Sequence, residues 1–156
     1  MKNIIIFGKT FEVIEQKSKK DLVKVEGNSV VVEKCKKPAD YLIEDYLAGL
    51  LYSELFKILN EIKDDGKIEI FGNLDFEVTD KIDNKKERVA KLKGNTIVVK
   101  INAIALPRDA LRYVIAHEIA HTVVKKHTRK FWDIVKTIHP SFEVGKELLV
   151  KYGSFL

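Results

Sequence analysis

The chain has 156 residues, of which 46% are hydrophobic and 33% are charged. This balance excludes a largely disordered chain, and the length allows one core to form without disulfides, so residues 1–156 are expected to form a single domain. The formal net charge of +5 arises mainly in residues 1–37 and 107–156, each with nine Lys or Arg against five Asp or Glu. The lysines are dispersed along the sequence, without an arginine cluster or interleaved aromatic residues, so charge alone gives only weak support to a nucleic-acid partner.

Cysteine content and hydropathy indicate a cellular compartment. The single cysteine, Cys35, excludes an internal disulfide and is typical of a reducing environment. The apolar run of residues 4–7 is too short for an export signal, and no run approaches the ~20 apolar residues that span a bilayer. We therefore expect a cytoplasmic protein with no membrane partner.

Residues 1–37 are predicted to be a region of short strands. Runs rich in Val, Ile and Phe are separated by turn residues, and they cover residues 3–7, 11–16, 22–26 and 29–33. The dipeptide Gly27-Asn28 divides the last two runs, in which apolar and polar residues alternate. This pattern predicts a hairpin with one buried face.

A long helix is predicted over residues 38–64. Pro38 is favourable in a first helical turn, and the acidic residues that follow it suit the positive end of the helix dipole. Apolar residues then recur at three- and four-residue spacing, namely Leu47, Leu50, Leu51, Leu55, Ile58, Leu59 and Ile62. The helix is expected to end near Gly66, which follows Asp64 and Asp65.

Strands return over residues 67–101, and helices follow over residues 107–156. The predicted strands cover residues 68–71, 74–79, 88–92 and 96–101, with turns at the two Gly-Asn pairs. The helical region starts at Pro107 and is expected to break near His127 and near Pro140. With no repeat or linker, the pattern predicts an α+β fold that contains antiparallel or mixed sheets of short strands.

The predicted helix after Pro107 contains a motif with metal-ligand spacing. His117 and His121 are four residues apart, so they lie about 40° apart on one helix face and can bind one zinc ion. Glu118 lies around the helix from them, where it can reach a water on the metal as a general base. The apolar stripe of this helix predicts that it is buried: Leu111, Val114, Ile115, Ile119 and Val123.

A catalytic zinc generally takes three protein ligands, so a third is needed. His127 would point away from the other two histidines on a continuous helix, so the helix must stop around residues 124–126 for His127 to return. Thr128 is then a candidate cap for a new helix. Glu143 and Glu147 remain rival third ligands, because some zinc peptidases use a downstream glutamate. His139 is expected at the surface or at a helix end.

These residues resemble the YgjP-like metallopeptidase domain. Residues 113–121 read Tyr-Val-Ile-Ala-His-Glu-Ile-Ala-His, and His127, Phe131 and Trp132 follow at the spacing of that family, whose broad pattern also extends to SprT-like and WLM peptidases. The specific match covers residues 106–140. The resemblance implies a zincin-like fold, one zinc ion per chain on His117, His121 and His127, catalysis by Glu118, and packing roles for Phe131 and Trp132.

Two positions depart from the family pattern. The family commonly has a Trp-Gly-Ser-like segment before the active helix, whereas residues 88–95 read Arg-Val-Ala-Lys-Leu-Lys-Gly-Asn. If this segment shapes the substrate cleft, specificity differs in this protein. Thr122 replaces a residue that is usually apolar, which is a minor change.

The expected activity is zinc-dependent hydrolysis of peptide bonds in a peptide or protein substrate. A substrate peptide could pair with a sheet edge, for which residues 96–101 are the candidate strand. Tyr113, Arg112, Tyr152 and His139 are candidates for stabilising the oxyanion. The alternatives are a nucleic-acid-associated protease or DNA-bound module of the SprT-like type, and a non-enzymatic protein with a structural zinc.

Overall fold

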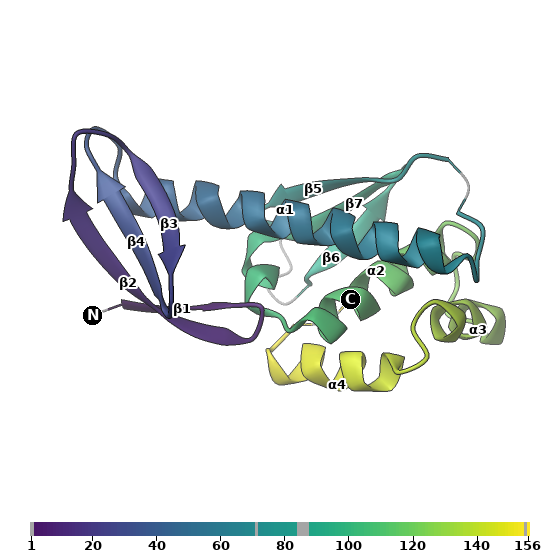
Figure 1. Cartoon of the computed structure of the whole chain (residues 1–156). Helices are drawn as coiled ribbons and strands as arrows, with labels where there is room; N and C mark the ends of the chain where they lie inside the picture. Colours follow the sequence, from purple (N-terminus) through teal and green to yellow (C-terminus); the bar gives the residue numbers. More distant parts are fainter. Residues whose placement is uncertain (1, 71, 84–87, 155) are drawn as a thin grey trace.

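The computed structural model describes residues 2–70, 72–83, 88–154 and 156. Two small sheets and four α-helices make up the described chain, with an α+β architecture as predicted (Figure 1). In the described part of the chain, no helix is both long enough and apolar enough to cross a membrane.

The first sheet consists of the four N-terminal strands, in the order β1-β2-β4-β3. Their bounds are β1 Lys2–Ile6, β2 Lys9–Lys17, β3 Leu22–Glu26 and β4 Ser29–Lys34. The predicted hairpin is present, because β3 and β4 pair antiparallel around Gly27, whose φ is 58°. β4 also pairs parallel with β2, so Val30 and Val32 lie in the middle of the sheet with no exposed surface.

The helix α1 (Ala39–Asp65) connects the two halves of the chain, as Figure 1 shows. Its observed bounds lie within one residue of the predicted helix, and Pro38 occupies the N-cap position. Gly66 ends the helix in the left-handed region, with φ 64°, and its N–H donates to the Lys63 carbonyl. The predicted apolar stripe is buried in the core, most completely at Leu51, Leu55, Ile58 and Leu59.

The second sheet has three strands in the order β5-β7-β6, and it corrects two predictions. The strands are β5 Asp75–Thr79, β6 Ala90–Lys93 and β7 Thr96–Lys100. The strand predicted at residues 68–71 is absent from residues 68–70, and residue 71 lies outside the described part. The strand predicted as a free edge, residues 96–101, is instead the central strand β7, because β5 and β6 pair with its two sides.

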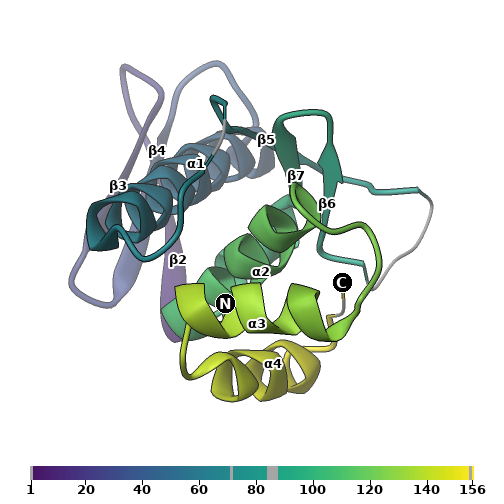
Figure 2. The ribbon, with the colours of Figure 1, turned by 90° about the vertical axis from the view of Figure 1, so that its right-hand side faces the viewer.

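Three helices complete the fold after the short 3-10 helix η1 (Ile101–Ala105). They are α2 Arg108–His121, α3 Arg129–Ile138 and α4 Phe142–Lys151. Both α3 and α4 pack against α2, as Figure 2 shows from the side. α2 also contacts β6 and α1, so every turn of it is buried in the core. This burial fixes the position of the helix that carries the predicted motif.

Candidate metal centre

The buried helix α2 presents His117 and His121 on one face, as predicted. Their ring centroids are 4.8 Å apart, which is the separation that four-residue helical spacing produces. His117 is 5% exposed and Glu118 is 2% exposed, so neither is a solvated surface residue. Charged and polar groups are costly to bury without a partner, so their burial indicates a dedicated polar site.

The chain reverses after α2 and returns His127 to the same place. α2 ends at His121, three residues before the predicted stop, so Lys125 and Lys126 lie in the connection to α3. The Thr122 hydroxyl donates to the Ile119 carbonyl at 2.6 Å, which helps to end the helix. Thr128 occupies the N-cap position of α3 as predicted, although its side chain makes no capping hydrogen bond.

The three histidines form one group of potential metal ligands. One ring nitrogen from each of His117, His121 and His127 lies within 4.8 Å of the others. Nε2 of His121 and Nε2 of His127 are 3.2 Å apart. Two nitrogens at 2.0–2.1 Å from a tetrahedral zinc are about 3.3 Å apart, so this pair has the separation that zinc requires. The three-imidazole donor set and the spacing of this pair therefore fit zinc.

The second nitrogen of His121 is also engaged. Nδ1 of His121 lies 3.3 Å from the Val124 carbonyl oxygen, to which it can donate. Such a hydrogen bond fixes the tautomer that leaves Nε2 free as a ligand. Desolvation, followed by the neighbouring His117, lowers the pKa of both His121 and His127 below the usual histidine value. These shifts favour the neutral imidazole, which is the form that binds a metal.

Glu118 lies beside the histidine group, not within it. Its Oε1 is 3.4 Å from Nδ1 of His117. The burial of this carboxylate next to potential ligands suits proton transfer at the site. The nearby Tyr113 is also buried, and desolvation together with Glu118 raises its pKa to about 12. Tyr113 therefore retains its hydroxyl proton at neutral pH.

Aromatic residues of α3 support the histidines from one side. The Phe131 ring is fully buried and lies 4.6–5.0 Å, centroid to centroid, from all three imidazoles. Trp132 is half-buried and stacks on Phe142 of α4, and its ring lies 6.2 Å from the His117 ring and 6.0 Å from the His127 ring. Both residues have the packing role that the sequence suggested.

The rival ligands lie elsewhere in the fold. Among the described residues, Glu143 and Glu147 of α4 are not members of the metal-ligand group. His139 was expected at the surface or at a helix end; it lies at the C-cap of α3, as the second alternative predicted, but it is only 3% exposed because α3 ends there against the core. Its ring bonds to the Asp109 backbone, and burial, followed by Arg112, lowers its pKa.

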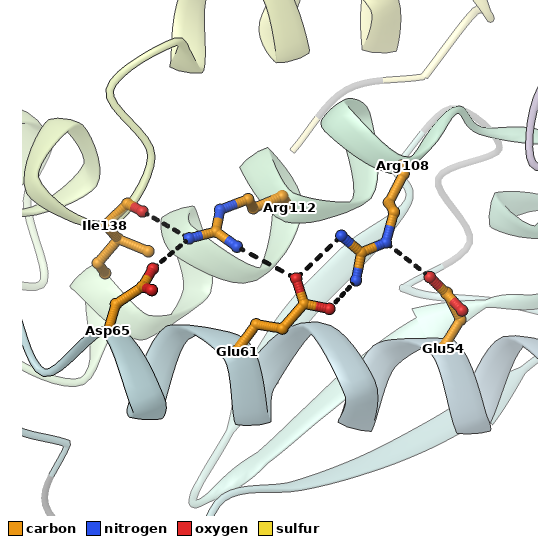
Figure 3. A network of polar contacts seen from close by, with 6 residues as sticks. All are labelled: Glu54, Glu61, Asp65, Arg108, Arg112 and Ile138. Atoms are coloured by element: carbon orange, nitrogen blue, oxygen red, sulfur yellow. Dashed lines mark hydrogen bonds and ion pairs between the residues drawn. The ribbon is translucent and has the colours of Figure 1, made fainter.

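The structure separates the four oxyanion candidates. Arg112 points toward α1 and Asp65 (Figure 3), and its helical spacing from His117 and His121 places it on another face of α2. The Tyr152 hydroxyl lies near Gly8 and Pro107, at the opposite end of α2 from His121. His139 faces Asp109 in the first turn of α2. Tyr113 alone of these four has its ring within 6.0 Å of the His117 ring.

An ionic network that was not predicted fastens α2 to α1. Arg108 bonds to Glu54 and Glu61, and Arg112 bonds to Asp65 and to the Ile138 carbonyl at the end of α3 (Figure 3). In the sequence, this network is indicated by Arg108 and Arg112 on one helix and by Glu61 and Asp65 on the other, each pair at four-residue spacing. Because Arg112 belongs to α2 and bonds to both α1 and α3, it positions α3 against the helix that carries the motif.

The family comparison agrees with this geometry. The chain belongs to the family described as the YgjP-like metallopeptidase domain, whose pattern matches residues 1–152. The match extends well beyond residues 106–140, where the motifs lie, so the N-terminal sheet is part of the family domain. The family implies a metal ion, and the three histidines are a group that could hold one. A comparison with curated proteins gives no significant match.

Proposed function

We propose that this protein is a zinc-dependent peptidase in which His117, His121 and His127 hold the metal. The observation that carries the proposal is the convergence of three imidazole nitrogens, two of them 3.2 Å apart, beside the buried Glu118. Three protein ligands leave one coordination position for water or substrate, as in catalytic zinc sites. A structural zinc would need a fourth ligand, and the group formed by the described residues has only three members.

Each residue of the site has a distinct role in this proposal. When bound, zinc supplies Lewis acidity, which activates water and polarises the scissile carbonyl. Glu118 accepts the proton of the attacking water on its carboxylate and delivers it to the leaving amine. Tyr113, which keeps its hydroxyl proton because its pKa is about 12, is the remaining candidate donor to the developing oxyanion. Phe131 excludes water from one side of the imidazoles.

The substrate peptide is proposed to pair with β6 instead of β7. β7 has a strand on each side, so its hydrogen-bonding groups are already used. In the described chain β6 pairs with β7 alone, and β6 contacts α2. A peptide on this edge would therefore lie alongside the helix that carries the histidines. Peptides N-methylated at single backbone positions test this: KM should rise at positions that pair with β6, and a uniform KM would contradict the proposal.

The metal assignment is tested by the zinc content of the purified protein. Protein prepared without a metal-affinity tag should contain about one zinc ion per chain, since three histidines form one site. His127→Ala should lower the zinc content strongly, and His139→Gln is the matched control, because it removes the histidine that is outside the group. Absence of zinc from the wild-type protein after zinc supplementation would contradict the proposal.

A further inference from the structure

Lysines that are dispersed in the sequence gather at one end of the first sheet. The connections β2–β3 and β4–α1 lie side by side there, and the Ser18 N–H donates to the Lys34 carbonyl at 3.0 Å. Between them is a hollow of about 410 Å³, which we call the lysine hollow; it is lined by Lys17, Ser18, Lys34, Cys35, Lys36, Lys37 and Pro38. None of the described acidic side chains belongs to this lining. Four positive charges therefore surround one concave surface.

The acidic groups of this neighbourhood are already engaged. Oδ1 of Asp21 accepts hydrogen bonds from three successive backbone N–H groups, the nearest at 2.7 Å from Cys35 N, and these bonds lower its pKa. Glu15 lies 4.0 Å from Lys34, and Asp40 pairs with Lys2. Within the described residues, Lys17 and Lys36 form no ion pair, and Lys37 makes the last of the contributions that lower the pKa of Asp21. These ammonium groups are therefore available to an external anion.

An exposed aromatic ring adjoins the lysines. Tyr41, in the first turn of α1, is 54% exposed, and Nζ of Lys37 lies 5.4 Å from the centre of its ring. Lysines beside an exposed aromatic ring are the combination with which proteins hold single strands, because phosphates bind the charges and bases stack on the ring.

We propose that the lysine hollow binds a single-stranded nucleic acid, with phosphates against Lys17, Lys34, Lys36 and Lys37 and a base against Tyr41. The class of ligand follows from charge and stacking, and neither interaction reads sequence, so binding should be largely independent of base identity. This proposal does not depend on the peptidase assignment.

The surroundings limit the path of the strand. Tyr41 also lines a second hollow of about 290 Å³, together with Glu44, Asp45 and Asp80, and these acidic residues would repel phosphates. The strand should therefore leave over the sheet and not follow α1. The hollow adjoins the first turn of α1, whereas Arg112 bonds to the last residue of that helix, Asp65. A helix of 27 residues is about 40 Å long, so bound nucleic acid would not block the histidine group.

The test is the affinity of the full-length protein for a fluorescent oligothymidylate of about 15 nucleotides, measured by anisotropy over a salt series. Wild type should bind with a logarithmic salt slope of about −0.7 per phosphate contact. Replacing Lys17, Lys34, Lys36 and Lys37 by Gln should weaken binding at least tenfold and flatten the slope. Tyr41→Ala should weaken binding, and Tyr41→Phe should restore it, because phenylalanine also stacks.

The matched control replaces Lys125, Lys126, Lys130 and Lys136 by Gln. All four are exposed and lie in the other basic segment, so the control also lowers the net charge from +5 to +1. It should keep wild-type affinity and slope. Equal weakening in both variants would overturn the proposal, as would absence of binding by wild type at low salt. Equal competition from anionic lipid vesicles or polyglutamate would show a general polyanion site and overturn the nucleic-acid assignment.

Discussion

The chemistry at the site depends on which nitrogen or oxygen each side chain presents. Nδ1 of His121 faces the Val124 carbonyl, so Nε2 is the atom that lies 3.2 Å from His127. Glu118 is adjacent to His117 but does not belong to the three-histidine group. At this scale the site separates residues that could hold a metal from a residue that could move a proton.

Glu118→Gln should abolish peptide hydrolysis without loss of metal. Glutamine keeps the shape of the side chain but cannot accept the proton of water, so kcat/KM should fall by a factor of about 10²–10⁴, the usual contribution of a general base. Zinc content should remain near that of wild type. Glu147→Gln on the exposed side of α4 is the control and should have wild-type activity. Full zinc-dependent cleavage by Glu118→Gln would remove Glu118 from this role.

At the scale of elements, the site depends on how closely α4 approaches α2. A Cβ atom at Gly145 would lie 2.7 Å from the Asp109 carbonyl oxygen and 2.7 Å from Cβ of Tyr113. Only glycine allows this separation, because backbone atoms cannot move aside as a flexible side chain does. The contact fixes Tyr113, whose ring lies within 6.0 Å of the His117 ring.

Gly145→Ala should therefore destabilise the protein by about 1–3 kcal/mol, the typical effect of overpacking. For a chain of this size that is a fall of several degrees in the thermal midpoint. Gly49→Ala in α1 is the matched control, because no neighbouring atom lies within 4 Å of the added Cβ. Alanine should raise stability there by about 0.5–1 kcal/mol. Calorimetry of both variants measures their thermal midpoints. The midpoint should fall for Gly145→Ala and rise for Gly49→Ala, and any other outcome contradicts the prediction.

At the scale of the whole molecule, α1 joins two regions with different properties. Its N-terminal end adjoins the lysine hollow, and its C-terminal half is fastened to α2 by Arg108 and Arg112 (Figure 3). Arg108, followed in effect by Arg112 and Lys57, lowers the pKa of Glu61 despite partial desolvation. The ion pairs between α1 and α2 should therefore weaken in acid.

Glu61→Gln should lower the thermal midpoint at neutral pH and have no effect in strong acid. The folded-state pKa of Glu61 is below 4.5. The ionised carboxylate therefore adds to the free energy of unfolding above pH 4.5, and this contribution is lost as pH falls through the folded-state pKa. A solvent-screened pair contributes at most about 1 kcal/mol, which corresponds to about 2–4 °C. Midpoints measured from pH 7 to pH 3 check this. Substitution of the exposed Glu69 by Gln is the control and should leave the midpoint unchanged. A difference between the midpoints of wild type and Glu61→Gln that persists at about pH 3 would contradict the expectation.

The local elements were largely predictable because short-range patterns specify them. The β3–β4 hairpin follows from Gly27-Asn28 and the alternating valines, and α1 follows from its leucine stripe. The strand expected at residues 68–71 is absent from residues 68–70, because the alternation Ile68-Glu69-Ile70 is too short to specify a strand and no neighbouring strand pairs with it in the described sheets. The order of strands depends on long-range pairing, which is why β7 was expected at an edge but lies in the centre.

For the metal centre, the sequence by itself determined the residues His117, Glu118 and His121, because helical spacing places them together wherever the helix lies. It also indicated that the chain must reverse before His127. Only the tertiary structure placed His127 beside His117 and His121 and left Glu143 and Glu147 outside this group of metal ligands. The reason is that α3 and α4 pack on different parts of α2. It also buried His139 and assembled the lysine hollow. These features depend on contacts between residues distant in sequence, which local periodicity does not encode.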